Sequence, residues 1–185
     1  MTEIDYPENV AEPEGSELVT VPSHHLRDFM NELVEDLLGS DKLIIYVGVT
    51  KQSSKLKSIF QEKGLDTNRI LFFDLATKIA GSAPDRAKNT VFMKPENINQ
   101  LNMKLDDAAN SVPDSRESVI VFDTVSTLSI YTDQELVLKF LNSLVAKSDD
   151  WGIKTVLVGI EEEMNEKLSS AVEKSVSQNF AIQDD

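Results

Sequence analysis

The sequence predicts an α/β fold of three layers, α/β/α, with a mostly parallel central sheet. From Leu18 onward, short β-branched runs with an apolar period near two alternate with longer segments whose period is near 3.6. This alternation is typical of strands that are each followed by a helix. Several of the strand candidates are nearly continuous in Val, Ile, Leu and Phe, which suits strands buried on both faces of a parallel sheet. Helices are therefore expected on both sides of that sheet.

Six short runs rich in β-branched and aromatic residues predict the strands. They lie at residues 18–21, 43–49, 70–73, 90–93, 119–122 and 155–160. Residues 177–182 are expected to add a further strand at one edge of the sheet.

Helices are predicted between these strands because apolar residues recur there at i, i+3, i+4 and i+7. The first such stripe runs from Leu26 to Leu38 and the fourth from Leu136 to Val145, and a closing helix is expected near Met164 to Val176. N-cap residues predict the helix starts and glycines predict the ends. The predicted starts are at Ser23, Ser53, Asn97 and Asp133, and the predicted ends are at Gly39, Gly64 and Gly152.

Residues 1–16 are expected to form an acidic, disordered tail, and residues 17–185 a single domain. The tail has too little apolar surface to offset the entropy of ordering it. A docking peptide is the alternative to a solvated tail. Its first fifteen residues contain no base, and their acids are Glu3, Asp5, Glu8, Glu12 and Glu14.

The composition argues against several classes of protein. With 32 acids and 18 bases, the formal charge of −14 repels phosphate backbones and anionic lipid, so no nucleic-acid partner is expected. There is no cysteine for disulfides, thiol catalysis or cysteine-ligated metals. No apolar run approaches the roughly 20 residues that span a bilayer, and residues 1–16 do not resemble a signal peptide. The sequence therefore predicts a cytoplasmic protein without membrane partners.

Candidate site residues lie at the carboxyl ends of the strands, where open parallel sheets bind ligands. Asp123 ends an apolar strand and can hold Mg²⁺ over a polyphosphate, or instead hydrogen-bond the backbone of the next turn. Ser23 precedes the first helix, whose N-terminal amides can bind a phosphate. His24 can join Asp123 or Asp74, or serve only as a capping or surface residue.

Three other features stand at the same predicted edge. Glu161, Glu162 and Glu163 suit an acidic helix start, with metal ligation as the alternative. Lys51 is the base with a possible ligand role, although such a lysine is more often solvated. The long connection from Leu75 to Lys88 is the first candidate for a regulatory surface.

The run from Val119 to Leu128, Val-Ile-Val-Phe-Asp-Thr-Val-Ser-Thr-Leu, resembles the Walker B strand and following turn of the RecA/KaiC superfamily of ATPases. Residues 43–74 are similar to the strand, helix, turn and Asp-terminated strand of the same superfamily. The resemblance spans residues 18–176 and is closest to KaiC-like proteins that are abundant in archaea. It implies a RecA-like P-loop fold and an archaeal source.

The chain departs from this family where catalysis would take place. After the first strand it reads Val-Pro-Ser-His-His-Leu, and no GxxxxGK[ST] loop (Walker A) occurs anywhere in the sequence. The second strand ends in Val49, Thr50 and Lys51, where the family carries a catalytic glutamate. Because positioning and electrostatics supply most of the rate in phosphoryl transfer, hydrolysis is expected to be lost. The resemblance therefore implies a degenerate, pseudo-ATPase member with no catalytic residues.

Three functions are compatible with these residues. The first is a non-catalytic KaiC-like module that acts by protein–protein interaction, in signal transduction or as a regulator of an active ATPase, with a homo-oligomer as one option and no cofactor. The second is a nucleotide-binding or weakly hydrolysing ATPase that takes ATP and magnesium through Ser23, His24 and Asp123. The third is an enzyme of unrelated chemistry built from Asp74, Asp123 and His24.

Overall fold

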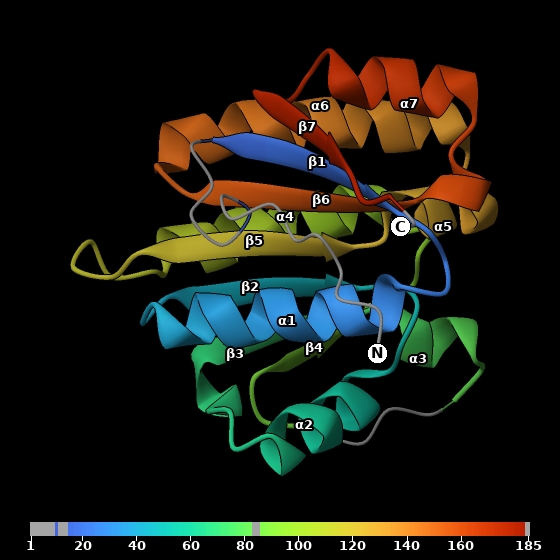
Figure 1. Ribbon diagram of the computed structural model, residues 1–185. Helices are drawn as coiled ribbons and strands as arrows, with labels where there is room; N and C mark the ends of the chain where they lie inside the picture. Colours follow the sequence, from blue (N-terminus) through green and yellow to red (C-terminus); the bar gives the residue numbers. More distant parts are fainter. Residues whose placement is uncertain (1–9, 11–14, 83–85, 184–185) are drawn as a thin grey trace.

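Seven parallel strands form the centre of the molecule (Figure 1). The computed structural model describes residues 10, 15–82 and 86–183. The strands are β1 (Ser16–Val21), β2 (Leu43–Gly48), β3 (Ile70–Asp74), β4 (Thr90–Phe92), β5 (Ser118–Asp123), β6 (Lys154–Ile160) and β7 (Gln178–Ala181). They lie in the order β4-β3-β2-β5-β6-β1-β7, and every neighbouring pair is parallel.

Helices cover both faces of the sheet, which confirms the predicted three-layer α/β/α fold (Figure 1). The face that carries Ile44 and Tyr46 packs against α1 (Leu26–Gly39) and α2 (Ser53–Glu62). The other face, which carries Ile45 and Val47, packs against α4 (Ile98–Asn110), α5 (Val125–Tyr131), α6 (Gln134–Trp151) and α7 (Glu166–Glu173). Three short elements complete the described part: α3 (Ala76–Ile79) and the 3-10 helices η1 (Thr67–Arg69) and η2 (Glu161–Glu163).

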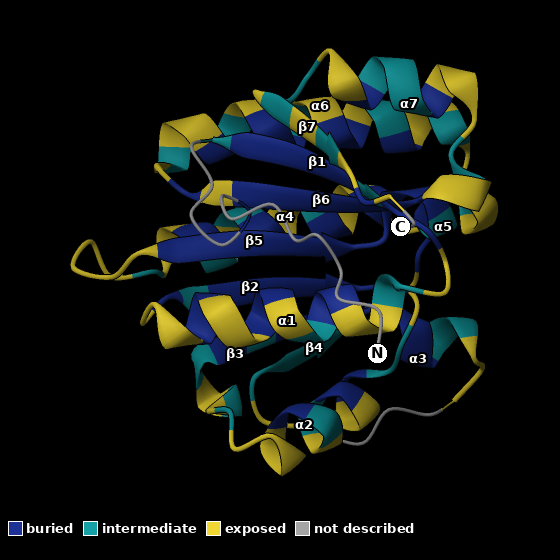
Figure 2. Cartoon of the chain, in the orientation of Figure 1, coloured by how far each residue is buried: buried dark blue, intermediate teal, exposed yellow. Residues whose placement is uncertain are grey.

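The strand predictions hold because both faces of the sheet are covered. β2 and β5 are buried almost along their whole lengths (Figure 2), as their continuous apolar sequences indicate. The predicted edge strand at 177–182 is β7, which pairs with β1. Helix α5 was not predicted as a helix, because its seven residues are too few for a 3.6-residue period to stand out.

Of the four predicted N-caps, two hold that position and two do not. The Asp133 side chain caps α6 by accepting hydrogen bonds from the amides of Glu135 and Leu136. Asn97 holds the N-cap position of α4 without a side-chain hydrogen bond. Ser23 and Ser53 were wrong as N-caps: α1 begins two residues later, after His25, and Ser53 is itself the first residue of α2. Both serine side chains bond to a distant carboxylate instead of capping their helices.

The predicted helix ends also differ in part. Gly152 is the C-cap of α6 and takes the left-handed conformation, with φ 65°, that favours glycine. Gly39 is still helical and Ser40 is the C-cap of α1. The closing helix, predicted near Met164 to Val176, is shorter at both ends: α7 runs from Glu166, after the N-cap Asn165, to Glu173.

Two of the predicted irregular segments are only partly described. Ser16 is the first residue of β1, and Val10 is buried among apolar residues on the α1 face. The other residues of the predicted acidic tail, 1–9 and 11–14, lie outside the described residues. Within the connection from Leu75 to Lys88, residues 76–79 form α3, and residues 83–85 are not described. No helix in the described ranges is both long and apolar enough to cross a membrane.

The caps generate a stability prediction. Replacing Asp133 with Ala leaves the first amides of α6 without their acceptor and is expected to lower the free energy of unfolding by about 1 kcal/mol. Asn97→Ala, at an N-cap whose side chain makes no such bond, is the matched control and is expected to cost much less. Urea unfolding followed by circular dichroism measures both, and equal losses would contradict the assignment.

Candidate functional site

A crevice opens at the carboxyl edge of the sheet, at the point where the helices that follow two neighbouring strands pack on opposite faces of the sheet. β2 and β5 lie side by side, but β2 leads into α2 on one face and β5 leads into α5 on the other. Such points are the usual ligand sites of open α/β sheets. A cavity of about 520 Å³ lies there, lined in part by Lys51, Lys55, Thr127, Tyr131 and Ile160. A more apolar cavity of about 450 Å³ opens near the opposite edge, away from the polar strand ends.

Asp74, at the end of β3, is buried and binds the starts of two helices. Its carboxylate accepts hydrogen bonds from the amide of Ser53 at 2.8 Å and its hydroxyl at 2.6 Å. It also accepts from the amide and hydroxyl of Thr77, both at 2.8 Å. These bonds tie α2 and α3 to the sheet, so the Asp74 oxygens are occupied by protein donors.

Asp123, at the end of β5, is 2% exposed, and its side chain receives hydrogen bonds from Tyr46 in β2 and from Thr50, the second residue after that strand. The Tyr46 hydroxyl donates to Oδ2 at 2.7 Å, and the Thr50 hydroxyl lies 3.0 Å from both carboxylate oxygens. Gly48 stands opposite Asp123 in the strand register. A Cβ at Gly48 would lie 3.4 Å from the Tyr46 ring and from the Lys51 carbonyl, which is an ordinary contact distance.

Burial is the main cause of the shifted pKa values of Asp123 and Tyr46. It raises the pKa of Asp123 above its ordinary value, and the hydrogen bonds from Tyr46 and Thr50 and the charge of Lys51 only partly oppose that rise. Burial, with the neighbouring Asp123 carboxylate, raises the pKa of Tyr46 well above 10. Tyr46 therefore stays protonated and remains a donor throughout the physiological range.

Ser23 is bound to a carboxylate from the other end of the chain. The Glu162 oxygens accept from the Ser23 amide at 2.9 and 3.1 Å and from its hydroxyl at 2.7 Å. The Ser23 hydroxyl holds the pKa of Glu162 below its usual range, and the charge of His24 adds to this effect. The Ser23 amide and hydroxyl thus meet a protein carboxylate, whereas the first amides of α1 come later, from Leu26 onward.

His24 lies in the turn before α1 and not on the helix. Side chains of adjacent residues on a helix would point about 100° apart, whereas the His24 and His25 ring centroids lie 4.1 Å from each other. The glutamates that follow β6 were predicted as a helix start. They form η2, where Glu162 binds Ser23 and Glu163 accepts from the Thr127 hydroxyl at 2.7 Å.

The strand register separates the predicted site residues. Asp74 and Asp123 flank Gly48 from the two strands next to β2, so their backbones lie roughly 9–10 Å apart at the usual strand spacing. Ser23 and His24 follow β1, which is separated from β5 by β6. In the described ranges, no group of three or more His, Asp or Glu side chains is placed to hold a metal ion. Whether Asp123 binds magnesium stays a prediction.

Sequence reasoning missed the partners of these residues. In the sequence, Tyr46 looks like one more apolar strand residue. Neither Thr50 nor Glu162 belongs to a local motif that would indicate its hydrogen-bond partner. No local pattern marks these bonds, because they join residues that lie far apart in the chain.

Tyr46→Phe is expected to lower the free energy of unfolding by about 2 kcal/mol, because it deletes a hydrogen bond to a buried carboxylate and changes little else. Tyr131→Phe, at an exposed tyrosine of α5, is the matched control and is expected to be nearly neutral. Urea unfolding of both variants checks the difference. Similar losses in the two would show that the Tyr46–Asp123 bond does not stabilise the fold.

The raised pKa of Asp123 predicts a pH dependence. Because the folded pKa lies above the unfolded value of 3.8, the native state binds this proton more tightly. The contribution of Asp123 to stability therefore rises as the pH falls through the folded pKa and is lost as the pH rises through it. Relative to Asp123→Asn, the wild type should lose unfolding free energy as the pH rises above about 4, until the pH has passed the folded pKa of Asp123; urea unfolding measures this loss. A difference that is constant or reversed would contradict this assignment.

Solved structures share the fold of this chain, although no protein-family model and no curated protein sequence matches it. The chain is similar to the uncharacterized protein PH0321 from Pyrococcus horikoshii, solved in complex with an unknown peptide, with 12% identity, a TM-score of 0.68, and coverage of 89% of this chain and 76% of that one. It is also similar to the KaiC-like protein PH0186 from Pyrococcus horikoshii OT3, with 10% identity, a TM-score of 0.58, and coverage of 85% and 67%.

A third similar structure is the flagellar accessory protein FlaH from Methanocaldococcus jannaschii, with 10% identity, a TM-score of 0.58, and coverage of 90% of this chain and 70% of that one. At these identities the likeness concerns the fold alone. Together with the strand order and the helices on both faces, it shows that this chain has the KaiC-like fold of the RecA type.

Proposed function

We propose that this chain is a non-catalytic RecA/KaiC-type module that binds a protein partner at the carboxyl edge of its sheet, in signal transduction or in the regulation of an active ATPase. The observation that carries the proposal is the bond between Glu162 and Ser23. A protein carboxylate takes the amide and the hydroxyl of Ser23, the residue that the nucleotide-binding alternative would use for a phosphate. A cytoplasmic location and an archaeal source stay predictions from the sequence.

The other carboxylates of the edge support the same conclusion. Asp74 is surrounded by Ser53 and Thr77, and Asp123 by Tyr46 and Thr50. A phosphoryl-transfer site needs acids that are free to hold a metal and donors that are free to neutralise developing charge. Here these groups stabilise the fold, which favours a scaffold over a catalyst.

The surface next to this edge supports a protein partner. Four large apolar side chains are strongly exposed among the described residues, and three of them lie within seven residues of one another: Ile130 and Tyr131 end α5, and Leu136 is in the first turn of α6. Exposed apolar groups gathered in one place are typical of interaction sites. PH0321, a protein of the same fold, was solved with a peptide bound.

The alternative is a nucleotide-binding protein in which Asp123 holds magnesium. The cavity of about 520 Å³ at the switch between β2 and β5 favours it, because Lys51 and Lys55 line the cavity and can meet a phosphate. The two functions differ in whether ATP binds.

Calorimetric titration with ATP and ADP, with and without magnesium, separates them. We expect no saturable heat at concentrations that reveal dissociation constants up to about 1 mM, or about 4 kcal/mol of binding free energy. Saturable, magnesium-dependent heat that disappears in Asp123→Asn would favour the alternative and reject the proposal.

The Glu162→Ala variant tests whether Glu162 blocks a nucleotide site, because the substitution removes the carboxylate that binds the Ser23 amide and hydroxyl. Glu161→Ala, at the exposed neighbouring glutamate, is the matched control. We expect neither variant to bind ATP, since no lysine-bearing glycine loop follows β1. ATP binding by Glu162→Ala alone would show that Glu162 closes a competent nucleotide site.

A further inference from the structure

We propose that the cavity between α2, α3 and α5 binds an acidic peptide segment of a partner protein, one that also carries an apolar side chain. This inference rests on the proposed function and names the chemistry of the partner. Its evidence is the pair of lysines in the cavity, the apolar surface beside them, and the charge of the rest of the molecule.

The lysines stand on the α2 side of the cavity. Lys51 is half-buried in the turn after β2, and Lys55 is exposed on the first turn of α2. Within the described part of the chain, neither has a carboxylate within 4.0 Å. Glu163 is the acid that lines the same cavity, and it accepts the hydroxyl of Thr127. The cavity is therefore lined by two lysines that can meet an incoming anion, of which Lys51 also acts on the buried Asp123 carboxylate, and by one carboxylate that already has a donor.

The apolar part of the surface begins on the α5 side. Tyr131 lines the cavity and is 47% exposed, and its neighbour Ile130 is 63% exposed. Leu136, at the start of α6, is 47% exposed. The Thr132 hydroxyl donates to the Pro95 carbonyl at 2.9 Å, which anchors the connection between α5 and α6 to the loop before α4. A preformed surface of this kind can take an apolar side chain at a low cost in ordering.

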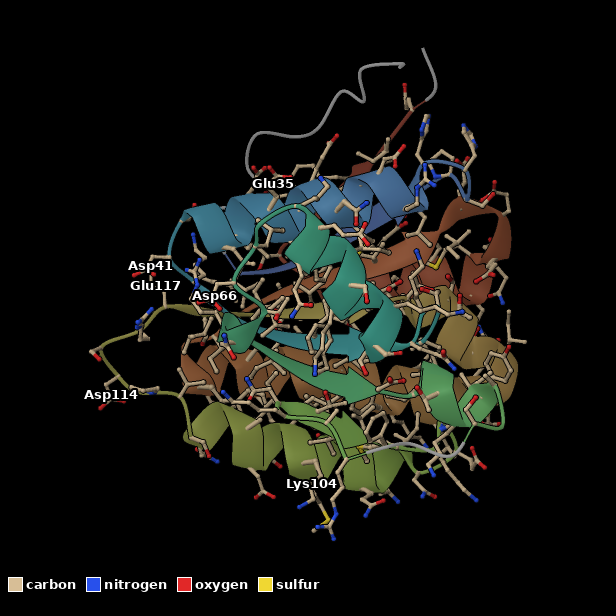
Figure 3. The ribbon with its side chains drawn as sticks, turned by 90° about the horizontal axis from the view of Figure 1, so that it is seen from below. Glu35, Asp41, Asp66, Lys104, Asp114 and Glu117 are labelled. Atoms are coloured by element: carbon tan, nitrogen blue, oxygen red, sulfur yellow. The ribbon has the colours of Figure 1, made fainter. Side chains whose placement is uncertain are left out.

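Charge confines an acidic segment to the lysine pair, because the same edge also carries the exposed Glu161 and Glu162. The chain carries a formal charge of −14, so an acidic peptide is repelled from most of its surface. Asp41, Asp66 and Glu117 gather at the opposite edge of the sheet (Figure 3), where Asp41 pairs with Arg69 and Arg116. The lysine pair thus offers an acidic segment a local site at the carboxyl edge.

A peptide carboxylate suits the cavity better than a polyphosphate does. Two separate lysines on one side can each pair with a carboxylate of an extended segment, whereas a polyphosphate also needs closely spaced backbone amides. The Ser23 turn, which could supply an amide, is bound by Glu162. The adjoining apolar surface has no role in holding phosphates.

The test is fluorescence anisotropy of a labelled synthetic peptide, Glu-Glu-Leu-Trp-Glu-Glu, titrated with the full chain. A second peptide in which lysine replaces every glutamate is the matched probe. We expect saturable binding of the acidic peptide only, with a dissociation constant below about 1 mM, that weakens as salt is added.

Variants locate the site. The double variant Lys51→Glu/Lys55→Glu is expected to weaken binding by at least about tenfold, and Ile130→Asp by a smaller factor. Lys154→Glu/Lys174→Glu makes the same change of charge at exposed lysines of the opposite edge and is expected to bind like the wild type. All four lysines and Ile130 are at least partly exposed, and circular dichroism verifies that each variant is folded.

The outcomes separate this inference from the proposed function. Failure of the wild type to bind the acidic peptide, or equal weakening by the control variant, overturns the inference and leaves a protein partner of other chemistry open. Binding of ATP that the Lys51→Glu/Lys55→Glu variant abolishes overturns both. Self-association that the same variant removes in sedimentation equilibrium would make the occupant a second copy and would also overturn the inference.

Discussion

A parallel sheet brings the carboxyl ends of all its strands to one edge, and a carboxylate buried there must receive hydrogen bonds from the protein. In this chain β3 and β5 both end in such an acid, on either side of β2. The donors for Asp74 come from Ser53 and Thr77, so the first turns of α2 and α3 are held against the sheet. The donors for Asp123 come from Tyr46 and Thr50. Satisfying two acids therefore sets the course of the chain at this edge.

The same constraint decides what the edge can do. Hydrogen bonds that satisfy a buried acid leave fewer polar groups for a ligand, and removing one donor leaves its partner unsatisfied at a cost of about 1–3 kcal/mol. The Ser23 turn is likewise closed by Glu162. Groups without such a structural role lie further out, on the α2 and α5 sides of the cavity. A binding function built from these outer groups disturbs no bond on which the fold depends.

The sheet could be predicted from the sequence because its signal is local. The apolar runs of β2 and β5 specify strands buried on both faces, whichever residues they finally meet. The site could not be predicted in this way, because its bonds join distant parts of the chain. Tyr46 and Asp123 are 77 residues apart, and Ser23 and Glu162 are 139 residues apart. Ser23 and Ser53 both looked like helix caps, since a serine before a helix has the same local pattern whether its oxygen bonds the helix or a remote acid. Only the tertiary fold distinguishes these cases.

A metal ion and a hydroxyl donor compete for the same lone pairs of a carboxylate, which has about four of them. At Asp123 the two donors are not equivalent. Tyr46 is fully buried and stays protonated, so it cannot leave without opening the core. Thr50 is exposed at the mouth of the cavity, and rotation about one side-chain bond withdraws its hydroxyl. The two donors use about two of these lone pairs, so the others could take a magnesium ion while both hydroxyls stay in place, and an ion that needs more of them would displace Thr50 before Tyr46. The scaffold and the nucleotide-binding alternatives thus share the Tyr46–Asp123 bond.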